Sequence, residues 1–437
     1  KVCGDGLTPR AVAQLVKMGV DTSESAGWTR NRGLRVVADD TAIELDWPDL
    51  QGFPDYGLTR TRYDFDQLLA ERAVAAGASL RTGVQVTAPL FDLAGRVAGV
   101  TARVEGEPVT YRAPLVVAAD GVSGRLALAL GIKRDPKRPM GVAVRQYYKS
   151  EAKHDDEYLE SWLALRTADQ PDVLQPGYGW IFGLGDGRVN VGLGVLNSSA
   201  GYGKTNYRAL LRDWLEATPE AWGLRDESAA DGPVRGAALP MGFNRVPHYS
   251  RGLMLVGDSG GMVNPFNGEG IAYAIESAEI AAEAAAAALR QPNAPRREAQ
   301  LKRYPELMSL RLGSYYRMGQ IFVHLIGQPR IMKLCTEHGL QRPALMRLVL
   351  KLLANLTDEP GGDFADRIVN GMRIVTPRPG ALGGRLTGAA RTRARLTSPS
   401  RRADARLTSP AERADDRLAG SARRADDRLA SFAERRA

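Results

Sequence analysis

The sequence predicts an α/β layered domain that is interrupted by an antiparallel sheet and followed by a helical region. Helical patterns alternate with short apolar strands in residues 1–137, and the same alternation returns in residues 246–298. Residues 138–245 are rich in strand patterns, so we expect an inserted antiparallel domain there. Residues 299–376 are mainly helical, and residues 377–437 form a tail of different composition.

The first part of the α/β domain begins with two predicted helices and a strand. Residues 9–18 follow a helical pattern, and Pro9 suits the first turn because no N–H is needed there. Residues 66–77 form the second predicted helix, which Gly77 ends as its C-terminal cap. A strand is expected over residues 79–86.

Two further patterns complete this first part. Residues 96–104 and 108–112 alternate between apolar and polar side chains as the arms of a hairpin do. Residues 115–119 are a short, continuously apolar run, which is typical of a strand buried in a parallel sheet. Helices that alternate with such strands indicate an α/β fold.

The inserted sheet contains the predicted strands 142–148, 179–184 and 188–195. The chain then returns to the α/β domain through a strand over residues 253–256. An Ala-rich helix follows over residues 271–289. We therefore expect the two separated segments to pair in one sheet.

The helical region over residues 299–357 is expected to be interrupted at Pro329 and Pro343. Its last helix has an apolar stripe that Arg347 and Lys351 flank. The stripe consists of Leu345, Leu348, Val349, Leu352, Leu353 and Leu356. It either packs on the core or rests on a membrane surface.

The tail carries most of the positive charge. From Ala381 onward there are 14 Arg and 7 acidic residues, a net of +7 out of +9, which leaves 45 basic and 43 acidic residues before it. Residues 391–434 form four repeats of 11 residues, each with one Leu. One Leu per repeat is too sparse for a coiled coil, so we expect disorder or weak helix. Contact with an anionic membrane or a nucleic acid is the alternative.

The composition excludes several classes of protein. Two cysteines cannot build a disulfide framework, and the four histidines show no metal-ligand spacing, so no metal is expected. There is no run of 18 apolar residues and no signal peptide. We therefore expect a cytoplasmic protein, with peripheral contact to the inner face of the membrane as an option.

The strongest motif runs from Leu253 to Ile271. An apolar strand delivers Gly257-Asp258 to its carboxyl end, where an Asp can accept hydrogen bonds from a polyol such as the ribityl chain of a flavin. Asn267-Gly-Glu-Gly270 then starts the Ala-rich helix. Its glycines permit close approach of the backbone, and free N–H groups at the helix start favour an anion. An ordinary helix cap and loop is the alternative.

A second motif supports this interpretation. Residues 116–120 form a strand that ends in Asp120-Gly, and Ser123 and Arg125 follow before a helix. Alone, the pattern would equally fit a turn with an N-terminal helix cap.

Together these motifs resemble a known group of proteins. Asp120-Gly, Gly257-Asp258 and Asn264-Pro-Phe-Asn-Gly-Glu-Gly-Ile271 look like the FAD-binding motifs of aromatic hydroxylases and geranylgeranyl reductases. Lys1-Val-Cys-Gly-Asp-Gly-Leu-Thr-Pro-Arg10 and Pro176-Gly-Tyr-Gly-Trp180, with Asn190-Val-Gly192 after it, resemble the geranylgeranyl reductase family, and the opening is similar to menaquinone reductases. The likeness extends from residue 1 to about residue 357.

The resemblance implies an FAD-binding Rossmann-like domain of the aromatic hydroxylase type, with the inserted sheet as its substrate domain. By its position in the family pattern, Arg62 is expected to reach the FAD phosphates and the backbone of Val86 to contact the adenine. Without the resemblance, Arg62 would be a surface charge and Val86 part of the core. The full set of expected FAD-binding residues is Cys3, Gly4, Gly6, Arg62, Val86, Asp120, Asp258, Gly268, Gly270 and Ile271.

The chain departs from the family pattern in one respect. Family members begin with a strand, a Gly-x-Gly-x-x-Gly turn and a helix that hold the pyrophosphate, and no such module is present here. We therefore expect an FAD domain truncated at its N-terminus that binds FAD poorly or not at all. Stoichiometric yellow cofactor on the purified chain would contradict this.

The resemblance implies reduction of an isolated C=C bond of a prenyl chain, in a menaquinone tail or a geranylgeranyl group. Cys3, in a loop flanked by glycine, is expected to supply the proton or to position the flavin ring. Tyr178 and Trp180, two apart on a strand, are expected to line the pocket with their π faces. The plainer interpretations are a packed small residue for Cys3 and core aromatic residues for the pair.

Several partners and rival functions follow from the same reasoning. The expected substrate is a prenyl lipid or prenylquinone, the electron donor is NAD(P)H or a ferredoxin-like protein, and no specific nucleic acid is expected. The main rival is a class A flavin monooxygenase or halogenase. The other is an inactive fragment whose Arg-rich tail binds something acidic.

Overall fold

The computed structural model describes residues 2–167, 171–199, 202–358 and 362–376, and the structural statements below concern this part of the chain. The repeats predicted for residues 391–434 lie outside it. The strands are β1 (Gly6–Leu7), β2 (Thr29–Asn31), β3 (Gly33–Ala38), β4 (Thr41–Asp46), β5 (Gly57–Thr59), β6 (Val84–Phe91), β7 (Val97–Val104), β8 (Glu107–Arg112), β9 (Val116–Ala118), β10 (Met140–Lys149), β11 (Tyr158–Trp162), β12 (Gly177–Gly183), β13 (Arg188–Leu196), β14 (Ala230–Pro240), β15 (Tyr249–Ser250) and β16 (Leu253–Leu255). The α-helices are α1 (Pro9–Lys17), α2 (Arg62–Ala75), α3 (Arg125–Ala129), α4 (Tyr207–Leu215), α5 (Ile271–Leu289), α6 (Ala294–Leu301), α7 (Tyr304–Met308), α8 (Ser314–Ile326), α9 (Pro329–Leu334), α10 (Pro343–Ala354) and α11 (Phe364–Val375).

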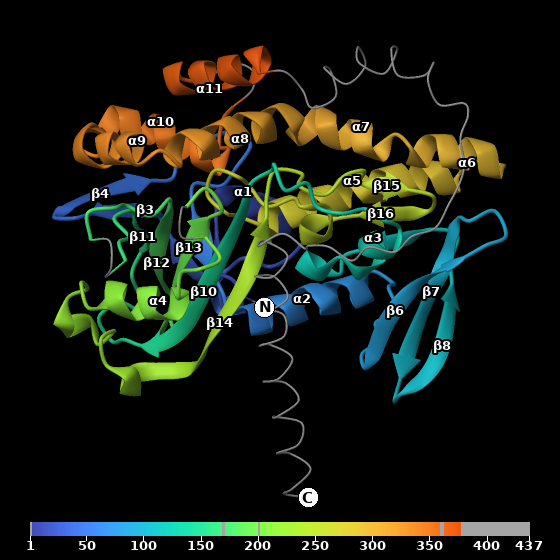
Figure 1. The fold of residues 1–437 in the computed structure, drawn as a ribbon, viewed down its shortest axis with the longest axis horizontal. Helices are drawn as coiled ribbons and strands as arrows, with labels where there is room; N and C mark the ends of the chain where they lie inside the picture. Colours follow the sequence, from blue (N-terminus) through green and yellow to red (C-terminus); the bar gives the residue numbers. More distant parts are fainter. Residues whose placement is uncertain (1, 168–170, 200–201, 359–361, 377–437) are drawn as a thin grey trace, which may run out of the picture.

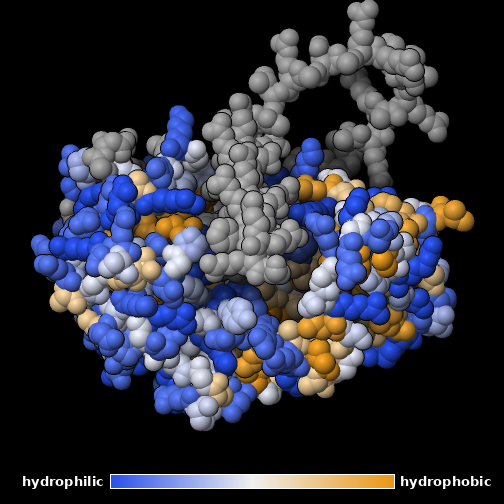
Figure 2. All heavy atoms as spheres, turned by 90° about the horizontal axis from the view of Figure 1, so that it is seen from below, coloured by the Kyte–Doolittle hydropathy of each residue, from blue (hydrophilic) through white to orange (hydrophobic). Residues whose placement is uncertain are grey.

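Helices form a layer along one side of the molecule, and the sheets lie below it (Figure 1). The seven-stranded sheet lies under one end of this layer and the β6–β8 sheet under the other. Viewed from below, the surface is hollowed between these two parts (Figure 2).

Strands β9 and β16 are parallel neighbours in a small sheet with the order β15-β16-β9. Their register pairs Ala118 with Leu255, so the carboxyl ends of both strands lie side by side, as predicted from the two motifs. The prediction of a strand buried on both faces is wrong for Val117, which is 47% exposed because β9 is the edge strand of this sheet.

The first helices confirm their predictions with one shifted boundary. Helix α1 begins at Pro9, and its apolar residues Ala11, Val12 and Leu15 are buried on the side that contacts α5. Helix α2 begins four residues earlier than expected because Thr61 caps it, accepting a hydrogen bond from the Asp64 N–H at 3.4 Å.

The β6–β8 sheet contains the predicted hairpin. Strands β7 and β8 pair in antiparallel register across a turn at Glu105 and Gly106, whose φ angles of 52° and 89° suit a two-residue hairpin turn. The strand predicted over residues 79–86 is wrong in its bounds, since β6 begins only at Val84, after Gly83 with φ 69°. The apolar Leu80 and the polar residues around it belong to the connection from α2.

The large sheet has the order β14-β10-β13-β12-β11-β3-β4. The strands predicted within residues 138–245 are confirmed, and β10, β11, β12, β13 and β14 pair in antiparallel fashion. The sheet also extends beyond the predicted segment, because residues 33–46 supply β3 and β4 and β3 pairs with β11 in parallel. Short hydrophobic strands so early in the chain carried no clear signal of where they would pair.

Side chains alternate along β12 and give the large sheet two different faces. Ile181 packs in the core that includes Trp214 of α4, and a Cβ on Gly179 would lie 2.6 Å from the Trp214 ring. The even-numbered aromatic residues point to the opposite face. That face turns toward the residues near the start of the chain.

The C-terminal helices confirm the predicted breaks, since Pro329 and Pro343 are the first residues of α9 and α10. The predicted stripe of α10 is mostly half-buried, with Leu356 buried and Leu345 41% exposed, and the buried face of the helix is formed by Met346, Leu350 and Ala354. Lys351, predicted to flank the stripe, is buried and donates to Asp363 at 2.7 Å and Asp366 at 3.0 Å. None of the helices in the described ranges is long and apolar enough to cross a membrane.

Candidate functional site

The predicted site begins at the carboxyl ends of β9 and β16. Asp120 follows β9 and Asp258 follows β16, and the short helical turns that carry them, residues 121–123 and 257–260, contact each other. Asp120 Oδ2 accepts a hydrogen bond from the Leu126 N–H at 3.3 Å. The structure therefore brings together the two carboxylates that the motifs predicted separately.

Arg245 joins these two turns and was not expected from the sequence. Its guanidinium is 2% exposed and donates to the Ser259 carbonyl at 3.1 Å. A Cβ on Gly124 would lie 1.4 Å from its Nη1, so only glycine fits beside this side chain. An arginine in a loop is usually exposed, and no pattern in the neighbouring residues indicated that Arg245 is buried.

The start of α5 forms the next part of the site. Gly268 has φ 76°, and Gly270 is the N-cap of a 19-residue helix that no side chain caps. Ile271 is the first helical residue. A Cβ on Gly270 would lie 3.7 Å from Asp258 Oδ1, so the carboxylate and the helix start share one small space. The unpaired N–H groups of such a helix start favour an anion there.

The Cys3–Gly6 loop closes the site from the side of the large sheet. Strand β1 pairs with β5, which places the loop against the aromatic face of β12. A Cβ on Gly4 would lie 3.0 Å from the Phe182 ring and 3.2 Å from Trp180 Nε1, and Gly6 is similarly close to Phe182. Glycine at both positions lets the backbone lie flat on these rings.

Tyr178 and Trp180 lie on the same face of β12, as predicted, with ring centroids 6.1 Å apart. The Tyr178 hydroxyl donates to the Asn267 carbonyl at 2.7 Å, just before the start of α5. Trp180 Nε1 donates to Asn190 Oδ1 at 2.9 Å. The aromatic strand thus connects the Cys3 loop with the Asn267–Gly270 loop.

A buried carboxyl group, Asp5, lies in this loop and was not predicted as a site residue. Asp5 is 1% exposed and has φ 66°, and its Oδ2 accepts from Tyr147 Oη at 2.6 Å and Asn190 Nδ2 at 2.8 Å. Burial raises the pKa of Asp5, which the two hydrogen bonds and the charges of Arg145 and Arg62 oppose in part.

A second acid, Glu269, was quoted within the motif but given no role. Thr8 Oγ1 donates to Glu269 Oε1 at 2.6 Å, which ties the start of α1 to the start of α5. Burial raises the pKa of Glu269 to about 7, against the opposing effects of the Thr8 hydrogen bond and the Arg10 charge. An acid that titrates near neutral pH beside Tyr178 is suited to proton transfer.

Arg62 and Val86 lie further from the start of α5. Arg62 Nε donates to Asp66 Oδ1 at 3.0 Å, and its pKa is raised by Cys3 and Asp66 although burial opposes this. Val86 lies on the edge strand β6 and is 37% exposed. Their predicted contacts to the phosphates and the adenine stay predictions.

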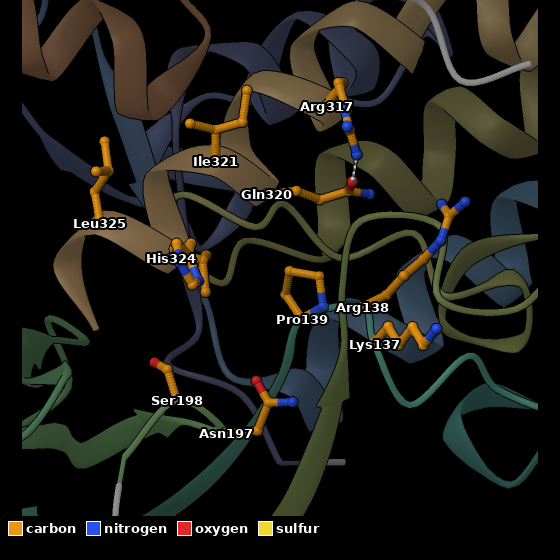
Figure 3. A pocket seen from close by; sticks show the side chains of 11 residues that line it. Lys137, Arg138, Pro139, Asn197, Ser198, Arg317, Gln320, Ile321, His324 and Leu325 are labelled. Atoms are coloured by element: carbon orange, nitrogen blue, oxygen red, sulfur yellow. Dashed lines mark hydrogen bonds between the residues drawn. The ribbon is translucent and has the colours of Figure 1, made fainter. Parts of the chain in front are cut away.

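A cavity of 430 Å³ opens elsewhere, between the N-terminal end of β10, the segment after β13 and helix α8 (Figure 3). It shares no residue with the predicted site. Its lining combines the basic side chains of Lys137, Arg138 and Arg317 with the apolar Ile321 and Leu325.

The residues of the site fit FAD. A carboxylate at a strand end suits the ribityl hydroxyls, and an uncapped helix start suits the negative charge of a reduced flavin. A side chain at Gly270 would fill the space between the two. The aromatic face of β12 packs against the Cys3 loop.

Comparisons with known proteins agree with this geometry. Residues 2–165 match the FAD-binding domain family. The menaquinone reductase of Mycobacterium tuberculosis strain H37Rv is 34% identical over 383 residues, which cover 87% of this chain and 89% of the relative. The digeranylgeranylglycerophospholipid reductase of Methanosarcina acetivorans is 30% identical over 65% of both chains.

Solved structures show the same fold. A geranylgeranyl bacteriochlorophyll reductase-like protein from Thermoplasma acidophilum superposes with a TM-score of 0.65 at 22% identity, covering 85% of this chain and 89% of that one. A flavin-dependent brominase superposes with a TM-score of 0.62 at 16% identity, covering 85% and 88%. The sequence relatives distinguish between these two, and the chain belongs to the geranylgeranyl reductase family of FAD-dependent oxidoreductases.

Proposed function

We propose that this protein reduces an isolated C=C bond in a prenyl chain with electrons from FAD. One observation carries the proposal: the aromatic face of β12 packs against the Cys3 loop and is hydrogen-bonded, through Tyr178, to the Asn267 carbonyl just before the uncapped start of α5. The named activities of the sequence relatives, menaquinone reductase and digeranylgeranylglycerophospholipid reductase, support the same class of substrate.

The chemistry explains why these residue types are needed. An isolated alkene is electron-rich and resists direct addition of hydride, so protonation of one carbon must accompany hydride transfer to the other. Bound reduced FAD supplies the hydride. In this proposal Cys3 Sγ gives the proton, and the faces of Tyr178 and Trp180 stabilise positive charge that develops on the substrate.

The hydrogen bonds of the site hold these groups in place. Trp180 is fixed by Asn190, and Tyr178 by the Asn267 carbonyl, so both rings keep their orientation when the substrate enters. Burial raises the pKa of Tyr178, so its hydroxyl stays protonated and keeps this hydrogen bond across the physiological range.

Anaerobic single-turnover measurement tests the proposal. The protein is loaded with excess FAD and is reduced with dithionite that is then removed. Addition of a geranylgeranyl lipid, which has no quinone to accept electrons from the flavin, should restore the absorbance of oxidised flavin, and Cys3→Ala and Trp180→Phe should slow this by about tenfold or more. Phe91→Leu, an exposed residue of β6, is the control. Reoxidation that requires oxygen would instead indicate a monooxygenase.

We propose NAD(P)H or a ferredoxin-like protein as the electron donor. Stopped-flow reduction of the FAD-loaded protein by each donor decides between them. Reduction by neither, with rapid reduction by dithionite, would contradict both.

We further propose peripheral contact with an anionic membrane through the surface around the 430 Å³ cavity. Ile321 and Leu325 of α8 are 49% and 46% exposed, and Lys137, Arg138 and Arg317 line the same cavity on the side away from Leu325. Exposed apolar side chains beside basic ones suit contact with anionic lipid headgroups.

Vesicle co-sedimentation tests this contact. The protein should bind phosphatidylglycerol vesicles more than phosphatidylcholine vesicles, and an Ile321→Asp, Arg317→Glu variant should lose most of this binding. Phe91→Asp, Arg103→Glu, at exposed positions of the β6–β8 sheet, makes the same change in charge and is the control. Equal binding by both variants would contradict the assignment of this surface.

A further inference from the structure

Asp5, Tyr147 and Asn190 form a hydrogen-bonded polar cluster that extends from the surface to the substrate side of the site. Tyr147 and Asn190 are directly opposite each other on the paired strands β10 and β13, and both donate to Asp5 Oδ2. Tyr147 is half-buried, and the guanidinium of Arg188, at the surface, lies 5.7 Å from its ring. Asp5 itself is fully buried. Tyr147, Asn190 and Asp5 therefore form a series of polar groups that runs from the half-buried Tyr147 to the fully buried Asp5.

Only one of the two oxygens of the Asp5 carboxyl group has a hydrogen-bond partner among the described residues. Trp180 Nε1 donates to Asn190 Oδ1, which forces the Asn190 amide to present Nδ2 to Asp5 and to the Cys3 carbonyl, at 2.8 Å each. All partners of Asp5 therefore converge on Oδ2. Oδ1 is buried and has no hydrogen-bond partner among the described residues. A buried polar atom left in this way costs stability and is commonly retained for function.

Asp5 is directly coupled to Cys3. The Asp5 N–H donates to Cys3 Sγ at 3.4 Å, and Arg62 also interacts with this sulfur. Asp5 adopts φ 66°, a left-handed conformation that is unusual for a residue other than glycine. This turn of the backbone places the carboxyl group and the sulfur in one short loop.

The surroundings of Asp5 act in opposite directions on the ionised and the protonated form of its carboxyl group. Arg145 and Arg62 favour the carboxylate, as do the donors Tyr147 and Asn190, while burial favours the neutral acid and dominates. Burial thus raises the pKa of Asp5, and the facing groups limit this rise, so both forms of the carboxyl group are accessible. A group with both forms accessible can give and regain a proton within a catalytic cycle.

We propose that Asp5 is the proton store of this site: it passes a proton to the Cys3 thiolate after each turnover and regains one from solvent along Tyr147. The inference rests on the proposed function and names a positioning residue that acts through Cys3.

The protons balance over one cycle. The Cys3 S–H bond breaks and a C–H bond forms on one alkene carbon, which leaves a thiolate stabilised by Arg62 and the Asp5 N–H. Bound reduced FAD would supply the hydride for the second C–H bond. The Asp5 O–H bond then breaks, the S–H bond forms again, and the Asp5 carboxylate takes up one proton from water. The sum is one proton and one hydride added to the alkene.

Infrared spectroscopy of the protein without cofactor tests the stored proton directly. A buried protonated carboxyl group gives a separate C=O stretching band, which should be present at pH 7 and absent in Asp5→Asn, an isosteric change that keeps an acceptor for Tyr147. Glu269→Gln identifies any contribution of the second raised acid. A spectrum that Asp5→Asn leaves unchanged would overturn the proposal.

Thiol labelling tests the coupling to Cys3. In a Cys335→Ser background Cys3 is the only thiol, and its alkylation by iodoacetamide can be followed against pH. Ionised Asp5 repels the thiolate, so at the alkaline end of the range Asp5→Asn should be labelled between about three- and tenfold faster than the background protein. At the acid end, where Asp5 carries its proton, the two rates should match. Identical rates at every pH would exclude the coupling.

Turnover separates a proton store from a structural role. With FAD and a prenylquinone, Asp5→Asn should complete the first turnover at close to the normal rate, because Cys3 already carries its proton. Later turnovers with excess dithionite should be slowed by about tenfold or more, and Asp5→Glu should restore part of the rate. Equal slowing of the first and later turnovers would show a structural role and overturn the proposal. If the unaltered protein forms no saturated product, the proposed function fails, while the infrared and labelling results still decide whether Asp5 stores a proton for Cys3.

Discussion

His248 should make the flavin-site fold sensitive to mild acid. The residue is 3% exposed, its ring contacts Phe243 at a centroid distance of 4.7 Å, and it lies against Gly260 at the end of the turn that carries Asp258. Burial lowers the pKa of His248 to about 4, and the Arg138 charge adds to this, while a backbone hydrogen bond at Gly260 opposes it. We therefore expect neutral His248 in the folded protein.

The sign and size of the effect follow from proton linkage. The unfolded chain takes up the proton near the ordinary pKa of 6.5 and the folded protein only near 4, so the unfolded state binds more protons between these values. Stability from this residue is complete above pH 6.5 and is lost as the pH falls toward 4. The loss amounts to about 3 kcal/mol, since one pKa unit corresponds to about 1.4 kcal/mol.

Urea unfolding at several pH values between 7.5 and 4 measures this loss. Other acidic and basic groups also contribute, so the quantity of interest is the difference between the unaltered protein and His248→Gln. That difference should shrink by about 3 kcal/mol over the pH range, because the variant lacks the titrating group. His324→Gln, on the exposed side of α8, is the control. Parallel stability curves for the protein and His248→Gln would refute the reasoning.

Three further predictions concern stability. Gly192→Ala should destabilise by about 2 kcal/mol in thermal unfolding, because its Cβ would lie 2.4 Å from the Trp180 ring, whereas Gly194→Ala, with its nearest neighbour at 3.9 Å, should be nearly neutral. Lys351→Ala should cost on the order of 3 kcal/mol in urea unfolding, because it leaves two carboxylates without their shared cation, and an equal effect at exposed Lys302 would contradict this. Glu269→Gln should be more stable than the unaltered protein at pH 8 but not at pH 4.5. The reason is that the stability of the unaltered protein falls as the pH rises through the raised pKa of Glu269, about 7. A difference in stability that does not depend on pH would argue against this.

Local patterns predicted the parts of the fold whose signals lie in adjacent residues. Helix α5 has the predicted bounds because the glycine-rich loop before Ile271 and the long Ala-rich run define it without help from the rest of the chain. The hairpin of β7 and β8 was found for the same reason. The start of β6 was placed too early, since five residues after α2 share the composition of a strand but connect the elements.

The sequence predicted the part of the site that lies within one motif. It did not predict the part that forms where several strands meet. Asp258, Gly268 and Gly270 follow each other closely, so their proximity could be read from the sequence. The Asp5 cluster depends on the register that sets Tyr147 opposite Asn190, and a shift by one residue would turn both side chains to the other face. No local pattern records this register.

The burial of certain charged residues was also not predicted from the sequence. Lys351 and Arg245 have side chains that are usually exposed, and each is buried only because a partner from another part of the chain meets it. For Lys351 the partner is the start of α11, and for Arg245 it is the turn that carries Asp258.

The mass of the product tests the central claim most directly. The protein with excess FAD and dithionite is incubated under nitrogen with a menaquinone whose prenyl tail is fully unsaturated, and the products are separated and fragmented. The account predicts a gain of two hydrogens located in the prenyl tail, absent without protein and strongly reduced in Cys3→Ala. A product that gains one oxygen in air, or a tail that stays unsaturated with FAD bound and reduced, would contradict it.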